Sequence, residues 1–154
     1  MLFKQLFDKE SCTYTYLIAD PATKEAVLID PVNTQLAVYL TLLQENDFTL
    51  KYSLETHVHA DHVTASGQLR QKVGAKTAVS SLCGADSADI QIQDGDVFEF
   101  GADESIKVIA TPGHTPGSTS FLWRDRVFTG DTLLINGCGR TDFQGGSAEA
   151  QYDS

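Results

Sequence analysis

The chain has 154 residues, of which 42% are hydrophobic, enough to build the core of one ordinary globular domain. Its formal net charge is −10, and the acidic residues are spread along the whole sequence. This charge argues against nucleic acid and against anionic membrane surfaces as partners, because binding to phosphates requires clustered Lys and Arg.

The first part of the chain reads as strands followed by a helix. Alternating and β-branched residues predict strands over residues 2–7, 13–19 and 26–29. A mostly apolar run predicts a well-covered helix over residues 35–46. A further strand over residues 52–55 then leads to His57, so a candidate functional residue directly follows a strand.

The second part begins with a helix predicted over residues 61–72, which Gly74 ends. Short strands follow near residue 78 and over residues 97–100, 106–110, 118–122 and 127–129. Ser147 is a candidate N-cap, with Glu149 in the first turn of a last helix. That helix is cut off after a few residues, so we expect the chain to be C-terminally incomplete relative to its fold. Clustered strands mixed with helices predict an α+β fold of stacked layers.

The cysteines and the hydropathy pattern together predict a cytoplasmic protein. Cys12, Cys83 and Cys138 are odd in number, widely spaced and without CxxC spacing, which favours reduced thiols over a disulfide framework or a cysteine zinc site. We expect Cys138 to be a small buried residue. No apolar run approaches the roughly 20 residues that span a bilayer, and the N-terminus lacks the pattern of a signal or transit peptide.

All four histidines of the chain lie in two short segments. The first segment is His57-Val58-His59-Ala60-Asp61-His62, and the second is Thr111-Pro112-Gly113-His114-Thr115-Pro116-Gly117. Asp131 follows in Gly130-Asp131-Thr132. Imidazole and carboxylate groups converging from separate loops are the ligands that a divalent transition metal requires.

Each of these residues also has an ordinary structural explanation when it is taken alone. A single buried histidine is usually a hydrogen-bonded core residue, Asp61 suits a helix N-cap, and Asp131 suits a turn. Their joint occurrence decides between the two explanations, because an HxHxDH segment followed by two further ligand-bearing loops is rare by chance. The sequence therefore predicts a metal site.

These three segments resemble the signature motifs of the metallo-β-lactamase superfamily. The resemblance covers essentially the whole chain and implies an αββα sandwich with the metal at one edge of its two sheets. It predicts a single metallo-β-lactamase-like domain over residues 1–154, equivalent to the N-terminal two thirds of the family fold.

Within that superfamily, the segment Gly137-Cys138-Gly139-Arg140-Thr141-Asp142-Phe143-Gln144 is similar to the persulfide dioxygenase (sulfur dioxygenase) branch. The resemblance implies one Fe(II) per chain, which oxidises glutathione persulfide with O2 to sulfite and glutathione, and zinc is a candidate substitute for the iron. It places the catalytic iron ligands at His57, His114 and Asp131. Such a set of two imidazoles and one carboxylate leaves coordination positions open for substrate and O2.

The same resemblance gives supporting roles to four further residues. His59, Asp61 and His62 are expected to lie behind the ligands and orient them. Arg140 is a candidate contact for an anionic carboxylate of glutathione. A structural role, either a salt bridge to Asp142 or a contact within the glycine-rich loop, is an equally good explanation of that arginine.

Two alternatives remain open. The first is a binuclear zinc thioester hydrolase of the glyoxalase II type, in which one ion binds His57, His59 and His114, and the other binds Asp61, His62 and Asp131. That reading needs a further histidine after His114, and the chain has none there. The second is an inactive fragment that retains the metal loops. A homodimer, as is common among relatives, is a further candidate. For the missing C-terminal part, three possibilities are open: a separate chain, cleavage after folding, or replacement by a partner.

Overall fold

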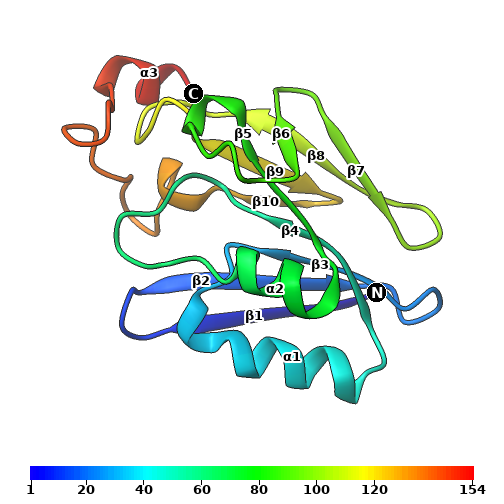
Figure 1. Cartoon of the computed structure of the whole chain (residues 1–154). Helices are drawn as coiled ribbons and strands as arrows, with labels where there is room; N and C mark the ends of the chain where they lie inside the picture. The colour runs from blue at the N-terminus through cyan, green and yellow to red at the C-terminus, as the bar shows by residue number, and fades with distance from the viewer. The chain divides into compact units, whose positions relative to one another are not determined.

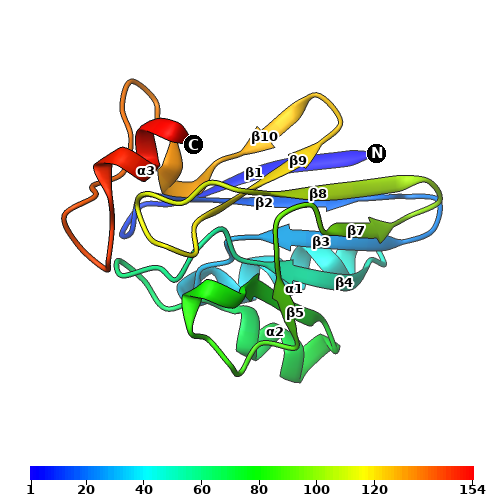
Figure 2. The ribbon, with the colours of Figure 1, turned by 90° about the horizontal axis from the view of Figure 1, so that it is seen from above.

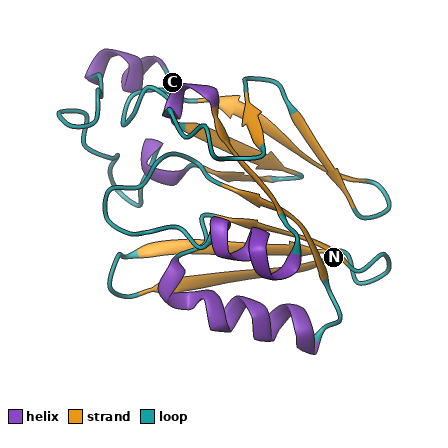
Figure 3. Cartoon of the chain, viewed as in Figure 1, coloured by secondary structure: helices purple, strands orange, loops and turns teal.

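The computed structural model describes all residues from Met1 to Ser154. It contains ten strands, three α-helices and three short 3-10 helices, coloured in chain order in Figure 1 and by type in Figure 3. Two compact units are present, the first formed by residues 1–55, 59–78 and 99–104 and the second by residues 56–58, 79–98 and 105–154. The mixture of helices and strands is the predicted α+β class.

The first unit is built on a mixed sheet in which the strands follow one another in chain order. Antiparallel pairs join β1 to β2 and β2 to β3, whereas β3, β4 and β5 run parallel. Parallel neighbours need a crossover connection: α1 (Leu36–Glu45) joins β3 to β4, and α2 (Ser66–Val73) joins β4 to β5. The strands are β1 (Leu2–Asp8), β2 (Thr13–Ala19), β3 (Glu25–Ile29), β4 (Thr49–Leu54) and β5 (Lys76–Ser80), and the 3-10 helix Asn33–Gln35 precedes α1.

Both helices of this unit pack on the same face of its sheet, as Figure 2 shows. Leu17 and Leu28, which are register partners in β2 and β3, are buried there together with Tyr39 of α1 and Leu69 of α2. Gly74 ends α2 in the left-handed conformation at φ 74°, a backbone state that glycine adopts without steric cost.

The second unit contains an antiparallel sheet in the order β10-β9-β8-β7. Phe121 of β9 lies opposite Val108 on one side and Phe128 on the other, and all three are buried. The last two residues of β5 belong to this unit, and β6 lies beside that strand. The elements are the 3-10 helices Ser81–Cys83 and Gly130–Thr132, the strands β6 (Ile90–Ile92), β7 (Val97–Phe100), β8 (Glu104–Ala110), β9 (Thr119–Trp123) and β10 (Arg126–Phe128), and the helix α3 (Ala148–Asp153).

The predicted strands are present, but the predicted helix over residues 61–72 was wrong at its start. It begins only at Ser66, because the preceding backbone pairs with another loop in place of forming helical hydrogen bonds. Asn33 N donates to Val63 O (2.9 Å), and Ala65 N donates to Pro31 O (2.7 Å). The HxHxDH segment is therefore a loop along its whole length. The short strand β6 was not predicted.

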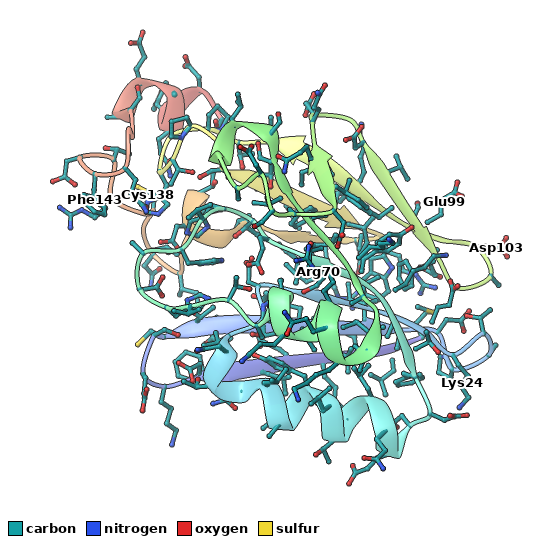
Figure 4. All side chains as sticks on the ribbon, in the orientation of Figure 1. Lys24, Arg70, Glu99, Asp103, Cys138 and Phe143 are labelled. Atoms are coloured by element: carbon teal, nitrogen blue, oxygen red, sulfur yellow. The ribbon has the colours of Figure 1, made fainter.

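Two further expectations concern cysteines and membranes. All three cysteines are free thiols, as predicted, but Cys138 is exposed and not buried. Figure 4 shows it with Phe143 on the loop between the last 3-10 helix and α3. None of the helices has the length and apolar character that crossing a bilayer demands.

Candidate metal centre

The structure brings the three predicted ligands together within the second unit. The ligand atoms of His57, His114 and Asp131 all lie within 4.8 Å of one another. His57 follows β4, His114 lies on the loop between β8 and β9, and Asp131 lies in the 3-10 helix after β10. Both histidines are buried, whereas the side chain of Asp131 is 45% exposed, so the cluster opens to solvent on the carboxylate side.

His114 is held in the tautomer that a metal ligand needs. Its Nδ1 lies 2.8 Å from the carbonyl oxygen of Arg140, which can only accept a hydrogen bond, so Nδ1 donates. In the neutral ring Nε2 then carries a lone pair, and it lies 3.4 Å from Asp131 Oδ2. His114 Nε2 and Asp131 Oδ2 are then two acceptors that face each other, an arrangement that requires either a cation between them or a proton on the ring nitrogen.

His57 is fixed by its neighbour in the sequence. Thr56 Oγ1 lies 3.0 Å from His57 Nδ1. The carbonyl of Thr56 accepts hydrogen bonds from Thr119 N (2.8 Å) and from Thr119 Oγ1 (3.1 Å), which tie this loop to the start of β9. The rings of His57 and His114 meet edge to face, with centroids 4.9 Å apart.

Two glycines lie so close to the candidate ligands or to Thr56 that a side chain at either position would overlap with them. A Cβ on Gly139 would lie 2.9 Å from both Asp131 Cβ and His114 Nδ1, and closer still to the Asp131 carbonyl oxygen. A Cβ on Gly130, where φ is 48°, would lie 2.7 Å from Thr56 Cβ. The donor set and this close packing together fit a single transition-metal ion.

His59 belongs to a different cluster, which lies in the first unit. Its Nε2 lies 3.2 Å from Asp30 Oδ1 and 3.4 Å from Glu55 Oε2, and all three side chains are buried. Burial lowers the pKa of His59, but the carboxylates of Asp30 and Glu55 raise it well above its ordinary value. Glu55 also accepts hydrogen bonds from the hydroxyls of Thr64 and Ser66.

Sequence reasoning did not single out Asp30 and Glu55 as site residues. The signal was nevertheless present, because each carboxylate directly follows a strand, β3 and β4, and these strands are parallel neighbours. Residues that follow neighbouring parallel strands meet at the same edge of a sheet. Backbone pairing continues there, since Asp30 N donates to Leu54 O (2.9 Å).

Asp61 and His62 lie beside His59, and these three groups offer ligand atoms within 4.8 Å of one another. His62 Nδ1 lies 3.3 Å from Asp61 Oδ2, which also accepts a hydrogen bond from Thr13 Oγ1 (3.2 Å). Burial is the largest single influence and raises the pKa of Asp61, but the hydrogen bond from His62, a backbone hydrogen bond and the interactions with His62 and His59 together outweigh it, so the net shift is downward. His62 Nε2 is buried without a hydrogen-bond partner, so a second cation is compatible with this set.

Arg140 forms the salt bridge that was one of its two predicted explanations. Its Nε and Nη2 donate to the two carboxylate oxygens of Asp142 at 2.8 and 3.1 Å, and the guanidinium lies over the Phe143 ring. The hydrogen bonds to Asp142 raise the pKa of Arg140. This pair is exposed, and contact of Arg140 with a substrate stays a prediction.

Comparison with known proteins identifies the class. The profile described as "Metallo-beta-lactamase superfamily" matches residues 12–82 and 84–154, and the chain belongs to that superfamily. Its fold is the α+β metallo-β-lactamase fold that the sequence predicted.

Within the superfamily, the chain resembles the persulfide dioxygenase branch. It is 48% identical to the mitochondrial persulfide dioxygenase ETHE1 of Bos taurus, an alignment that covers 100% of this chain and 61% of the relative. The crystal structure of ETHE1 from Myxococcus xanthus matches with a TM-score of 0.95 and 54% identity, covering 99% of this chain and 67% of that one. A hydroxyacylglutathione hydrolase of Cereibacter sphaeroides is 36% identical, covering 94% of this chain and 56% of the relative. The chain thus spans about three fifths of the length of the curated persulfide dioxygenases it matches.

Proposed function

We propose that this chain carries the metal centre of a non-haem Fe(II) persulfide dioxygenase that oxidises glutathione persulfide with O2. The observation that carries the proposal is the set of two buried imidazoles and one partly exposed carboxylate, with ligand atoms within 4.8 Å of one another. The similarity to persulfide dioxygenases from Bos taurus and Myxococcus xanthus supports the choice of reaction.

In this proposal His57, His114 and Asp131 hold one Fe(II). The iron supplies the electron transfer to O2 that amino-acid side chains cannot perform. The overall reaction consumes one persulfide, one O2 and one water, breaks the S–S bond, and yields one thiol, one sulfite and two protons. The outer sulfur loses four electrons, and O2 accepts them.

The protein's own contribution is orientation. The carbonyl of Arg140 keeps the proton of His114 on Nδ1, which aims the lone pair of Nε2 at the ion. Thr56 contacts Nδ1 of His57 and in turn is held by Thr119 of β9. With only three protein side chains as ligands, the ion would stay accessible to the substrate.

Arg140 is proposed to bind a carboxylate of the glutathione portion. The exposed pair with Asp142 supports this role, because its two parallel hydrogen bonds already present the guanidinium in the geometry that a carboxylate recognises. A substrate carboxylate would then replace Asp142 as the partner. His59, Asp61 and His62 would order the HxHxDH loop around the centre.

A binuclear thioester hydrolase is the second candidate function. Two observations favour it: the buried Nε2 of His62 without a hydrogen-bond partner, beside His59 and Asp61, and the similarity to a hydroxyacylglutathione hydrolase. In that case zinc would occupy the site, and a metal-activated water would attack the thioester.

Metal content and substrate choice separate the two candidates. The persulfide dioxygenase predicts one iron per chain, with O2 consumption and sulfite release when glutathione persulfide is added to Fe(II)-loaded protein. The hydrolase predicts about two zinc ions per chain and hydrolysis of S-lactoylglutathione. If the iron-loaded protein consumes no O2 when glutathione persulfide is added, the proposed dioxygenase function is wrong.

We propose that residues 1–154 form one metallo-β-lactamase-like domain, which the consecutive profile matches support, and a single cooperative unfolding transition would test it. We propose a cytoplasmic location, which the three free thiols support. The homodimer and a companion C-terminal chain stay predictions. Size-exclusion chromatography with mass detection would test both.

A further inference from the structure

The helix α3 connects the two loops that carry His114 and Asp131, all within the second unit (Figure 1). On the His114 side, Ser147 N donates to the carbonyl of Gly113 (2.8 Å), and Ser154 Oγ donates to the carbonyl of Pro112 (2.7 Å). These contacts come from the two ends of the helix. Its middle is free to contact the Asp131 loop.

Gln151 makes that second connection. Its Nε2 donates to the carbonyl of Thr132 (2.5 Å) and lies 3.5 Å from the carbonyl of Asp131. Both neighbours are acceptors, so only the nitrogen of the amide fits there. The other amide atom, Oε1, is buried without a hydrogen-bond partner.

The same side chain also presses against the His114 loop. A Cβ added to Gly113 would lie 2.5 Å from Gln151 Cβ, and it would lie closer still to Gln151 Cα and Oε1. Gln151 therefore stands between the residue that precedes His114 and the backbone of Asp131. Each of these loops holds its candidate ligand within one residue of the contact.

We propose that Gln151 is a positioning residue that sets the separation between His114 and Asp131 for the one-ion centre. The proposal rests on the metal centre of the proposed function. A methionine has nearly the same length and shape but no amide, so it would fill the space without donating to the two carbonyls. The Asp131 loop would then lose its link to α3, while the helix would stay attached through Ser147 and Ser154.

If Gln151 had a purely structural role, its replacement would lower the stability of the metal-free protein. The positioning role predicts little change in that stability. Gln151 already buries one acceptor without a partner, which is unfavourable for stability. Replacing the amide removes this unpaired acceptor as well as the two donated contacts. The stability of the metal-free protein is therefore expected to change little in Gln151→Met, whereas the geometry of the ion site changes.

The test compares wild type, Gln151→Met and the control Tyr152→Ala, whose side chain lies on the same helix and is 91% exposed. Each protein is titrated with Co(II), and the dissociation constant and the visible d–d absorption are recorded. Thermal unfolding of each metal-free protein is measured in parallel. We expect Gln151→Met to bind Co(II) at least roughly tenfold more weakly, with an altered spectrum and an unchanged metal-free midpoint. The control should match wild type.

The possible failures are distinguishable. If Gln151→Met binds Co(II) as tightly as the control and with the same spectrum, the proposed role of Gln151 is wrong, but the proposed metal centre is unaffected. A metal-free midpoint that falls in step with the affinity also overturns it, since the side chain would then be merely structural. If the wild-type protein does not bind Co(II) at a single site, the proposed metal centre itself is wrong.

Discussion

Replacing Gly139 with alanine is expected to damage the candidate metal centre without disturbing the fold. Gly139 does not have a positive φ, so alanine is acceptable to its backbone. The added Cβ would nevertheless lie 2.9 Å from both Asp131 Cβ and His114 Nδ1, whereas ordinary contact begins at 3.4 Å. His114 would have to retreat by about 0.5 Å, and Asp131, whose carbonyl oxygen lies closer still to the added Cβ, would have to retreat further. Both displacements exceed the roughly 0.2 Å that metal–ligand distances tolerate.

A displacement of this size should weaken metal binding about 10- to 100-fold, which corresponds to about 1.4–2.8 kcal/mol. Gly137→Ala is the matched control, because it lies in the same loop, has no positive φ, and its added Cβ would meet nothing within 4 Å. Competition titration with Co(II) or Fe(II) measures the affinity of both variants. If the two variants bind the ion equally well, the steric reasoning fails, and Gly139 does not shape the site.

Three further predictions concern recognition, packing and pH. Arg140→Met should raise the KM for glutathione persulfide roughly tenfold or more with kcat little changed, because the proposed charge-assisted contact with a substrate carboxylate would be lost; steady-state O2 uptake measures both constants. Phe121→Ala should lower the free energy of unfolding by about 3–5 kcal/mol in urea titrations, because the ring is fully buried between β8 and β10. Asp8→Asn should lower the thermal midpoint at pH 7. Hydrogen bonds, first from the backbone N–H and then from the hydroxyl of Ser11, hold the pKa of Asp8 well below its ordinary value. That stabilisation is present above the unfolded pKa of about 3.9 and is lost as the pH falls through the lowered folded value, so the difference between variant and wild type should shrink at acidic pH.

The strands and the candidate ligands were predictable because their signals are local. Alternating residues placed β1, β2 and β3 within a residue of their observed bounds. His57, which follows β4, lies with His114 from the loop after β8 and with Asp131 from the 3-10 helix after β10. Residue periodicity predicted the strands, the motifs predicted a metal site, and the resemblance to the persulfide dioxygenase branch implied the three candidate ligands.

The features that sequence reasoning missed depend on contacts between distant parts of the chain. The spacing of Val63, Leu69 and Val73 predicted a helix that starts near residue 61, but residues 63–65 form backbone hydrogen bonds with residues 31–33, so α2 begins late. Gln151 belongs to a six-residue helix, and nothing in its own segment reveals that its amide reaches the carbonyls of Asp131 and Thr132. Cys138 is exposed because it lies on a loop between two short helices, not in a strand.

The HxHxDH motif supplies four ligand-capable side chains, but their partners divide them into two groups. His57 lies with His114 and Asp131, whereas His59 has carboxylates near both ring nitrogens, Asp30 and Glu55 at Nε2 and Asp61 at Nδ1. The spacing of the motif shows which ligands are available, but it is the same in one-ion and two-ion centres and so does not distinguish them. The side chains that contact Nε2 of His59 follow β3 and β4, outside the motif. They support the proposed arrangement in which only the first histidine of the motif would bind the iron.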